Sequence, residues 1–117
     1  MRVYVASKAA HGPEWVAKRE AGYPVMSTWI DESAPGATSD WPDLWERCVR
    51  EAASADALVV IRRGDEVLKG AWAEVGAALA SGVPVFGVGC GDFSIRHHRL
   101  FTECATEDEA FERALRA

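Results

Sequence analysis

Glu74 is the residue of this sequence best placed for chemistry. It is the one charged residue in Gly70–Ser81, a run otherwise rich in alanine that ends just before Gly82. Apolar runs at Ala57–Ile61 and Val83–Val88 flank it, and this order predicts a strand, a crossover helix and a parallel strand. A carboxylate early in such a helix feels the helix dipole, which favours its ionised form. Held in a cleft it could attack the anomeric carbon of a sugar, although a surface glutamate that only interacts with the dipole would show the same spacing.

Other polar side chains follow the expected strands, at the edge where doubly wound α/β sheets bind ligands. Lys8, next to Ser7 after the first strand, could hold a phosphate. Trp29 and Asp31, which close the second, could stack on a base and hydrogen-bond it. A solvated lysine, a half-buried tryptophan and a loop-capping aspartate are the alternatives. The segments expected at this edge are Ser7–His11, Trp29–Asp31, Arg62–Lys69 and Gly89–Asp92.

Two glycines and two histidines complete the candidates. Gly70 and Gly76 lie four and two residues from Glu74, where the missing side chain allows close approach by a ligand or by another element. His97 and His98 are adjacent, and neighbouring residues seldom bind one metal ion together, so we expect no metal site. The loop after the first strand lacks a Ser/Thr-rich phosphate cradle, which argues against a flavin, and we expect no cofactor.

The elements that must position these residues alternate along the chain, which predicts one small doubly wound α/β domain over residues 1–117. Asp40 is the expected N-cap of one helix, and Thr106 with Glu109 has the capping-box pattern of another. The expected strands are Arg2–Ala6, Tyr23–Ile30, Ala57–Ile61, Val83–Val88 and Leu100–Ala105, and the expected helices are Glu14–Ala21, Pro42–Ser54, Gly70–Ser81 and Glu107–Ala117.

Composition limits the classes of partner. A formal net charge of -5 argues against broad attraction to nucleic acid polymers or anionic membranes. No apolar run approaches the ~20 residues that span a bilayer. The three cysteines, Cys48, Cys90 and Cys104, form neither a disulfide framework nor a metal motif, which favours a cytoplasmic location. Trp41 and Trp45, at capping and helical positions, are expected in the core.

Several segments together resemble the nucleoside 2-deoxyribosyltransferase-like family, which includes deoxyribosyltransferases and nucleoside 5'-monophosphate N-glycosidases. The matching segments are the opening Val3–Ser7, the strand Ala55–Ile61 and the run Lys69–Val85 with its Gly-x3-Glu-x-Gly-x-Ala core. Within the family, Ser27–Ile30 and Leu68–Gly70 resemble short bacterial and phage members.

The resemblance implies a flavodoxin-like three-layer sandwich with a four- to five-stranded, mainly parallel sheet. It also implies a homodimer or larger assembly whose active sites are completed by a neighbouring subunit. Glu74 matches the family nucleophile, which attacks C1' of the sugar, expels the base and forms a glycosyl ester that water or a second base resolves. Ser7 and Lys8 match positions that hold the sugar or its 5'-phosphate in family members.

Two positions depart from the family pattern. Cys48 and Leu68 stand where well-studied members have aspartates that orient the sugar hydroxyls or handle the base proton. Asp65 or Glu66, in the loop before Gly70, could substitute for one of them. Otherwise the chain could bind a nucleoside-like ligand without cleaving it, or serve as a small interaction domain.

Overall fold

A single sheet of four parallel strands forms the centre of the computed structural model, which describes all 117 residues. The strands are β1 (Val3–Ala6), β2 (Ala57–Ile61), β3 (Val85–Val88) and β4 (Phe101–Cys104), and they lie in that order across the sheet. Every residue of β1 and β2 is buried. This explains their uninterrupted apolar sequences, because a parallel sheet covered on both faces has no solvated side.

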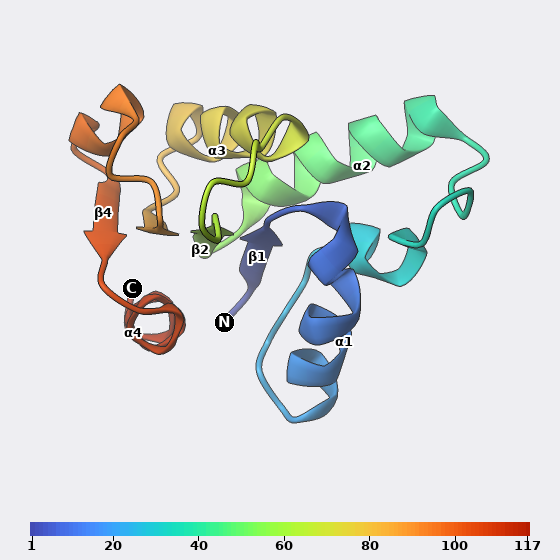
Figure 1. Ribbon diagram of the computed structural model, residues 1–117, viewed down its shortest axis with the longest axis horizontal. Helices are drawn as coiled ribbons and strands as arrows, with labels where there is room; N and C mark the ends of the chain where they lie inside the picture. The colour runs from blue at the N-terminus through green and yellow to red at the C-terminus, as the bar shows by residue number, and fades with distance from the viewer.

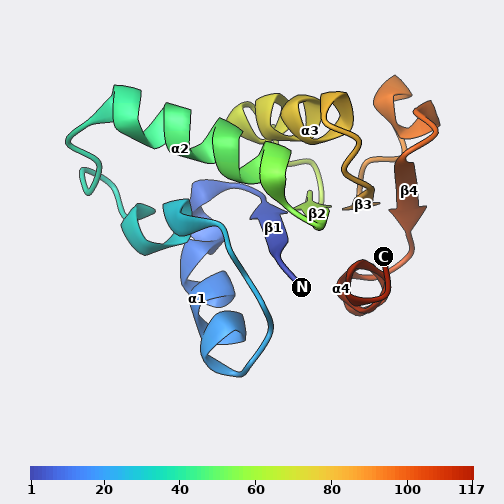
Figure 2. The same cartoon turned by 180° about the vertical axis from the view of Figure 1, so that it is seen from behind.

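Helices cover both faces of the sheet. They are α1 (Gly12–Glu20), α2 (Trp41–Ser54), α3 (Gly70–Ala80) and α4 (Glu107–Leu115). Figures 1 and 2 show α2 and α3 side by side over one face and α1 and α4 over the other. The chain is therefore an α/β three-layer sandwich of the flavodoxin-like kind, as expected. None of these helices is both long and apolar enough to cross a bilayer.

The expected second strand, Tyr23–Ile30, is absent. Only Val25 pairs with β1, through an isolated parallel bridge to Val3, and Thr28–Glu32 forms a 3-10 helix. This bridge lies on the free side of β1, where a fifth strand would lie, but it pairs only one residue. Pro24, which has no N–H to donate, directly precedes the bridge.

Side chains replace the missing strand's backbone bonds. The Ser27 hydroxyl accepts a hydrogen bond of 3.1 Å from the Val5 amide, which a neighbouring strand would otherwise bind. Glu51 of α2 accepts from both the Thr28 amide, at 2.9 Å, and its hydroxyl, at 2.8 Å. Ser27 and Thr28 therefore serve side-chain contacts to the sheet and to α2, and not a strand.

The predicted helix starts are confirmed. The Asp40 carboxylate accepts from the Asp43 amide at 3.0 Å at the start of α2. The Thr106 hydroxyl accepts from the Glu109 amide at 3.1 Å at the start of α4. The Glu109 carboxylate in turn accepts from the Ala105 amide at 2.8 Å, one residue before the N-cap.

Two tryptophans of α2 are outside the core, contrary to the expectation. Trp41 is 59% exposed and Trp45 is 42% exposed, as is Val49 one turn further on. These three residues, spaced four apart, form an apolar line on α2 that we call the α2 stripe. The helix buries its opposite side, with Cys48 and Ala52, against the rest of the molecule.

Candidate active site

Glu74 lies in a cavity of about 310 Å³ where α2, α3 and the segment after β1 meet. The side chain is on the second turn of α3 and is 7% exposed. The Tyr4 hydroxyl donates a hydrogen bond of 2.7 Å to Glu74 Oε1 from the buried strand β1. The carboxylate is therefore fixed at one oxygen by the sheet.

Burial raises the pKa of Glu74 to about 7. The Glu51 carboxylate contributes a smaller increase in the pKa, and the hydrogen bond from Tyr4 opposes it. The expectation that the helix dipole keeps Glu74 ionised is thus too simple, because loss of solvation outweighs the dipole at this depth. Near neutral pH both protonation states are populated, as is typical of carboxyl groups in active sites.

Five of the residues predicted from the sequence line this cavity: Ser7, Lys8, Trp29, Gly70 and Glu74. The rest of the wall is mainly apolar and comes from α2 and from the loop before α3. The full lining is Ser7, Lys8, Ala9, Trp29, Leu44, Trp45, Cys48, Val67, Leu68, Lys69, Gly70, Ala71 and Glu74.

The polar groups of Ser7 and Trp29 are engaged within the protein. The Ser7 hydroxyl donates to the Lys8 carbonyl at 3.0 Å and accepts from the Trp15 indole N–H at 2.8 Å. The Trp29 indole N–H donates to the Val5 carbonyl at 2.8 Å. Trp29 therefore offers the cavity an aromatic surface and no donor, and Ser7 mainly fixes the loop after β1.

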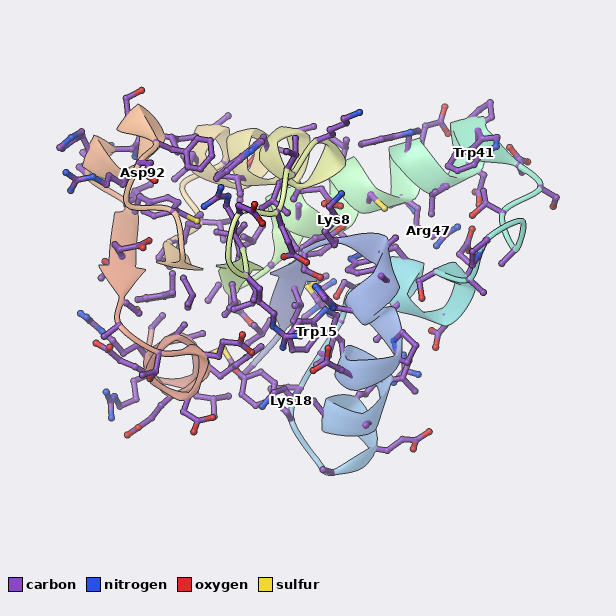
Figure 3. The ribbon with its side chains drawn as sticks, viewed as in Figure 1. Lys8, Trp15, Lys18, Trp41, Arg47 and Asp92 are labelled. Carbon is purple, nitrogen blue, oxygen red and sulfur yellow. The ribbon has the colours of Figure 1, made fainter.

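Two lysines supply positive charge to the cavity. Lys8 and Lys69 both line it, both are exposed, and neither takes part in any of the ion pairs of the structure. Figure 3 shows Lys8 near the middle of the molecule, above α1 and close to α3. Sequence reasoning missed Lys69, although its place directly before the first residue of α3 was a usable signal.

Four predicted residues do not line the cavity. Asp31 lies at the surface, where Arg19 binds its carboxylate at 2.7 Å. Glu66 is held by His11 at 2.6 Å and by the Arg63 amide at 2.8 Å. Other protein groups thus occupy both carboxylates.

Asp65 and Gly89 are also outside the cavity lining. Asp65 is exposed in a turn. Gly89 has φ +76, and a Cβ there would lie 2.0 Å from the Arg62 carbonyl oxygen. Its place is therefore explained by packing between two loops, and neither Asp65 nor Glu66 replaces the aspartates that the resemblance leads one to look for.

The two departures from the family pattern face the cavity. Leu68 is 6% exposed and Cys48 is 4% exposed. Burial raises the pKa of the Cys48 thiol to about 11, so the thiol stays protonated and is no nucleophile. Glu74 is consequently the one acidic side chain of the cavity lining.

The two glycines near Glu74 have different explanations. A Cβ on Gly70 would lie 2.8 Å from the Trp45 ring, so this glycine admits the ring of α2. Nothing lies within 4 Å of a Cβ on Gly76, which is exposed. The absence of a side chain at Gly70 is therefore explained by the close approach of α2, rather than of a ligand. Close packing does not explain the glycine at position 76.

Comparison with known proteins supports the fold. No protein-family model and no curated protein matches the sequence. Among solved structures, the chain is similar to the CMP N-glycosidase BcmB of Clostridium botulinum, with a TM-score of 0.59 and 15% sequence identity. The alignment covers 97% of this chain and 96% of that one. At this identity the similarity establishes a shared fold.

Proposed function

We propose that this chain cleaves the N-glycosidic bond of a nucleoside 5'-monophosphate or nucleoside, with Glu74 as nucleophile. The observation that carries the proposal is a single buried carboxyl group, with its pKa raised to about 7, in a cavity that two unpaired lysines also line. The fold shared with a CMP N-glycosidase over nearly the whole of both chains supports it.

The chemistry follows from the geometry of Glu74. Tyr4 holds Oε1, which leaves Oε2 to attack C1' of the sugar. The C1'–O bond forms as the C1'–N bond breaks, and the base leaves with the electron pair and takes a proton from water. Water then cleaves the glycosyl ester and regenerates the carboxylate. Attack by a second base in place of water would give transfer instead.

Hydrolysis of a nucleotide fits the cavity better than transfer between bases. Lys8 and Lys69 can hold a 5'-phosphate, which a free nucleoside lacks. The apolar Leu68 and the protonated Cys48 thiol provide no acid or base to exchange protons with an incoming base. Ser7 and Trp29 then shape the wall near the sugar.

The first test is Glu74→Gln, with release of free base measured by chromatography on a panel of nucleosides and nucleoside 5'-monophosphates. We expect a loss of roughly 10³-fold or more, because an amide cannot act as the nucleophile. Glu46→Gln, on the exposed side of α2 and outside the cavity, is the matched control and should keep full activity. Unchanged base release by Glu74→Gln would refute the assignment.

The same variant reports on its own folding. Because burial raises the pKa of Glu74 to about 7, this group favours the folded state at low pH, and that contribution is lost as pH rises through 7. Gln, which cannot ionise, avoids the loss. The melting temperature of Glu74→Gln should therefore exceed that of wild type increasingly from pH 4.5 to about pH 7 and by a constant amount above it, which would separate lost chemistry from lost structure.

A second candidate function is nucleotide binding without turnover. The aspartates of the family pattern are replaced by Cys48 and Leu68, and this favours a sensor module with the same cleft. Thermal-shift measurements with nucleosides, mononucleotides and nicotinamide nucleotides distinguish the two functions. Stabilisation without any release of base would support the sensor.

We also infer the setting in which the chain acts. All three cysteines are free and buried, which fits the reducing cytoplasm. The chain would act as a single domain over residues 1–117, and as a homodimer. The α2 stripe supports the dimer, because a second copy of the chain would remove its exposed apolar side chains from water.

A further inference from the structure

A second cavity of about 390 Å³ adjoins the first on the side away from Glu74. The two cavities share Ala9, Trp29 and Leu44. The remaining wall comes from the segment after the 3-10 helix Thr28–Glu32 and from the start of α2. Its full lining is Ala9, Ala10, Trp29, Glu32, Ser33, Ala34, Pro35, Gly36, Thr38, Trp41 and Leu44.

This second cavity offers no charge to a ligand. No lysine, arginine or histidine lines it. Its one carboxylate, Glu32, is held by Arg47 at 3.0 Å through one oxygen and by the Thr38 hydroxyl at 3.0 Å through the other. Both lysines of the site lie on the first cavity alone. The two cavities therefore differ in the kind of chemical group that they can accept.

The aromatic surface of the second cavity comes from two tryptophans. The ring of Trp29 is fixed by its bond to the Val5 carbonyl and lines both cavities. Trp41, on the first turn of α2, lines this cavity and is 59% exposed. Figure 3 shows Trp41 at the outer end of α2, with Arg47 further along the helix and Lys8 nearer to α3.

We propose that this second cavity, lined by Trp29 and Trp41, binds the uncharged aromatic base of the substrate, while the first binds the sugar and its phosphate. The inference rests on the proposed function. The base is attached to the carbon that Glu74 attacks, so it must lie next to the first cavity. The substrate could enter with its base in either cavity. With the base in the second cavity, its phosphate lies with Lys8 and Lys69 and its planar ring lies with the tryptophans.

The test uses Glu74→Gln as the parent protein, because we expect it to bind the substrate without cleaving it. Calorimetry measures binding of nucleoside 5'-monophosphates carrying the RNA and DNA bases, and of ribose 5-phosphate and 2-deoxyribose 5-phosphate. Adding Trp41→Ala should weaken the tightest nucleotide about 10-fold or more, because base–aromatic stacking is lost, and should leave the sugar phosphate unchanged. Trp72→Ala, in a tryptophan of α3 outside both cavities, is the matched control.

A second variant keeps the test independent of α2. Ala10 is exposed and lines only the second cavity, so Ala10→Leu fills it without touching the first. It too should weaken the nucleotide and spare the sugar phosphate. Equal effects on both ligands, or no effect on either, would overturn the base site alone. Failure of the parent protein to bind any of these ligands would overturn the proposed function and the base site with it.

Discussion

The buried pair formed by Tyr4 and Glu74 links the sheet to the cavity. Tyr4 is fully buried, and burial together with the nearby Glu74 carboxylate raises the pKa of its phenol far above the ordinary value. Tyr4 therefore remains a donor throughout the accessible pH range. It lowers the pKa of Glu74 against the larger effect of burial, so the position at which Glu74 titrates depends on a residue outside the cavity lining.

Tyr4→Phe tests this dependence. Since a nucleophilic carboxylate is active when deprotonated, activity should rise with pH through the pKa of Glu74, near 7 in the wild type. Removing a donor to the ionised form raises that pKa by about 1 unit or more, so the rise should move to higher pH and the rate at pH 7 should fall about 5-fold or more. The measurement is the rate of base release against pH.

The control for this variant is Tyr23→Phe. Tyr23 donates to the Phe111 carbonyl at 2.5 Å, on the opposite side of the sheet from α2 and α3. Its loss should leave the pH dependence where it is in the wild type. A Tyr4→Phe profile that is lowered uniformly, with no displacement along the pH axis, would show that Tyr4 acts only through packing.

At the scale of elements, the chain from Asp40 onward was predictable because its local signals agree with one another. The buried strands have continuous apolar sequences, α3 ends before Gly82 as expected, and Asp40 and Thr106 cap the helices that they precede. In each case the residues that decide the structure are neighbours in sequence. Such signals need no knowledge of tertiary contacts.

The segment Tyr23–Ile30 could not be predicted in this way. Its conformation depends on hydrogen bonds to Glu51 and Val5, which are distant in sequence. The Glu51 carboxylate accepts from the amide and hydroxyl of Thr28, and the Val5 amide donates to the Ser27 hydroxyl. The same limit applies to the site. Glu74 and Lys8 could be chosen from their positions after strands, whereas the contribution of Trp41 depends on how α2 lies against the segment before it.

Gly89→Ala tests how tightly the loops after β2 and β3 are joined. Gly89 has φ +76, and a Cβ would lie 2.0 Å from the Arg62 carbonyl oxygen. Arg62 in turn donates to the Gly89 carbonyl at 3.2 Å. Backbone must shift to admit the methyl group, so we expect a loss of about 2–4 kcal/mol in the free energy of unfolding, measured by urea denaturation.

Gly64→Ala is the matched control. Gly64 has φ +59, but nothing lies within 4 Å of a Cβ there. Its substitution should therefore lower the free energy of unfolding only through the unfavourable backbone conformation, by about 1 kcal/mol. The difference between the two variants isolates the steric contact with Arg62. Equal losses in both would mean that the two loops are free to separate.

At the scale of the whole molecule, the two outer layers of the sandwich differ. The α2 stripe places Trp41, Trp45 and Val49 in solvent on the layer that also borders the cavity. On the opposite layer, Leu115 of α4 is equally exposed, at 42%, but it lies at the end of its helix. A surface that is apolar over two helical turns favours a second copy of the chain, whose contact would adjoin both cavities, because Trp45 lines the first and Trp41 the second.

Val49→Glu tests this assembly. Val49 is 42% exposed and lines neither cavity, so a charge there should leave the fold and the site of one chain intact. In a dimer formed through the α2 stripe it would bury two like charges near the symmetry axis, which costs several kcal/mol. Sedimentation should show a dimer for the wild type and for Leu115→Glu, and a monomer for Val49→Glu. A monomeric wild type, or a dimeric Val49→Glu, would contradict the proposed interface. If a neighbouring chain also completes the site, base release by Val49→Glu should fall together with the dimer.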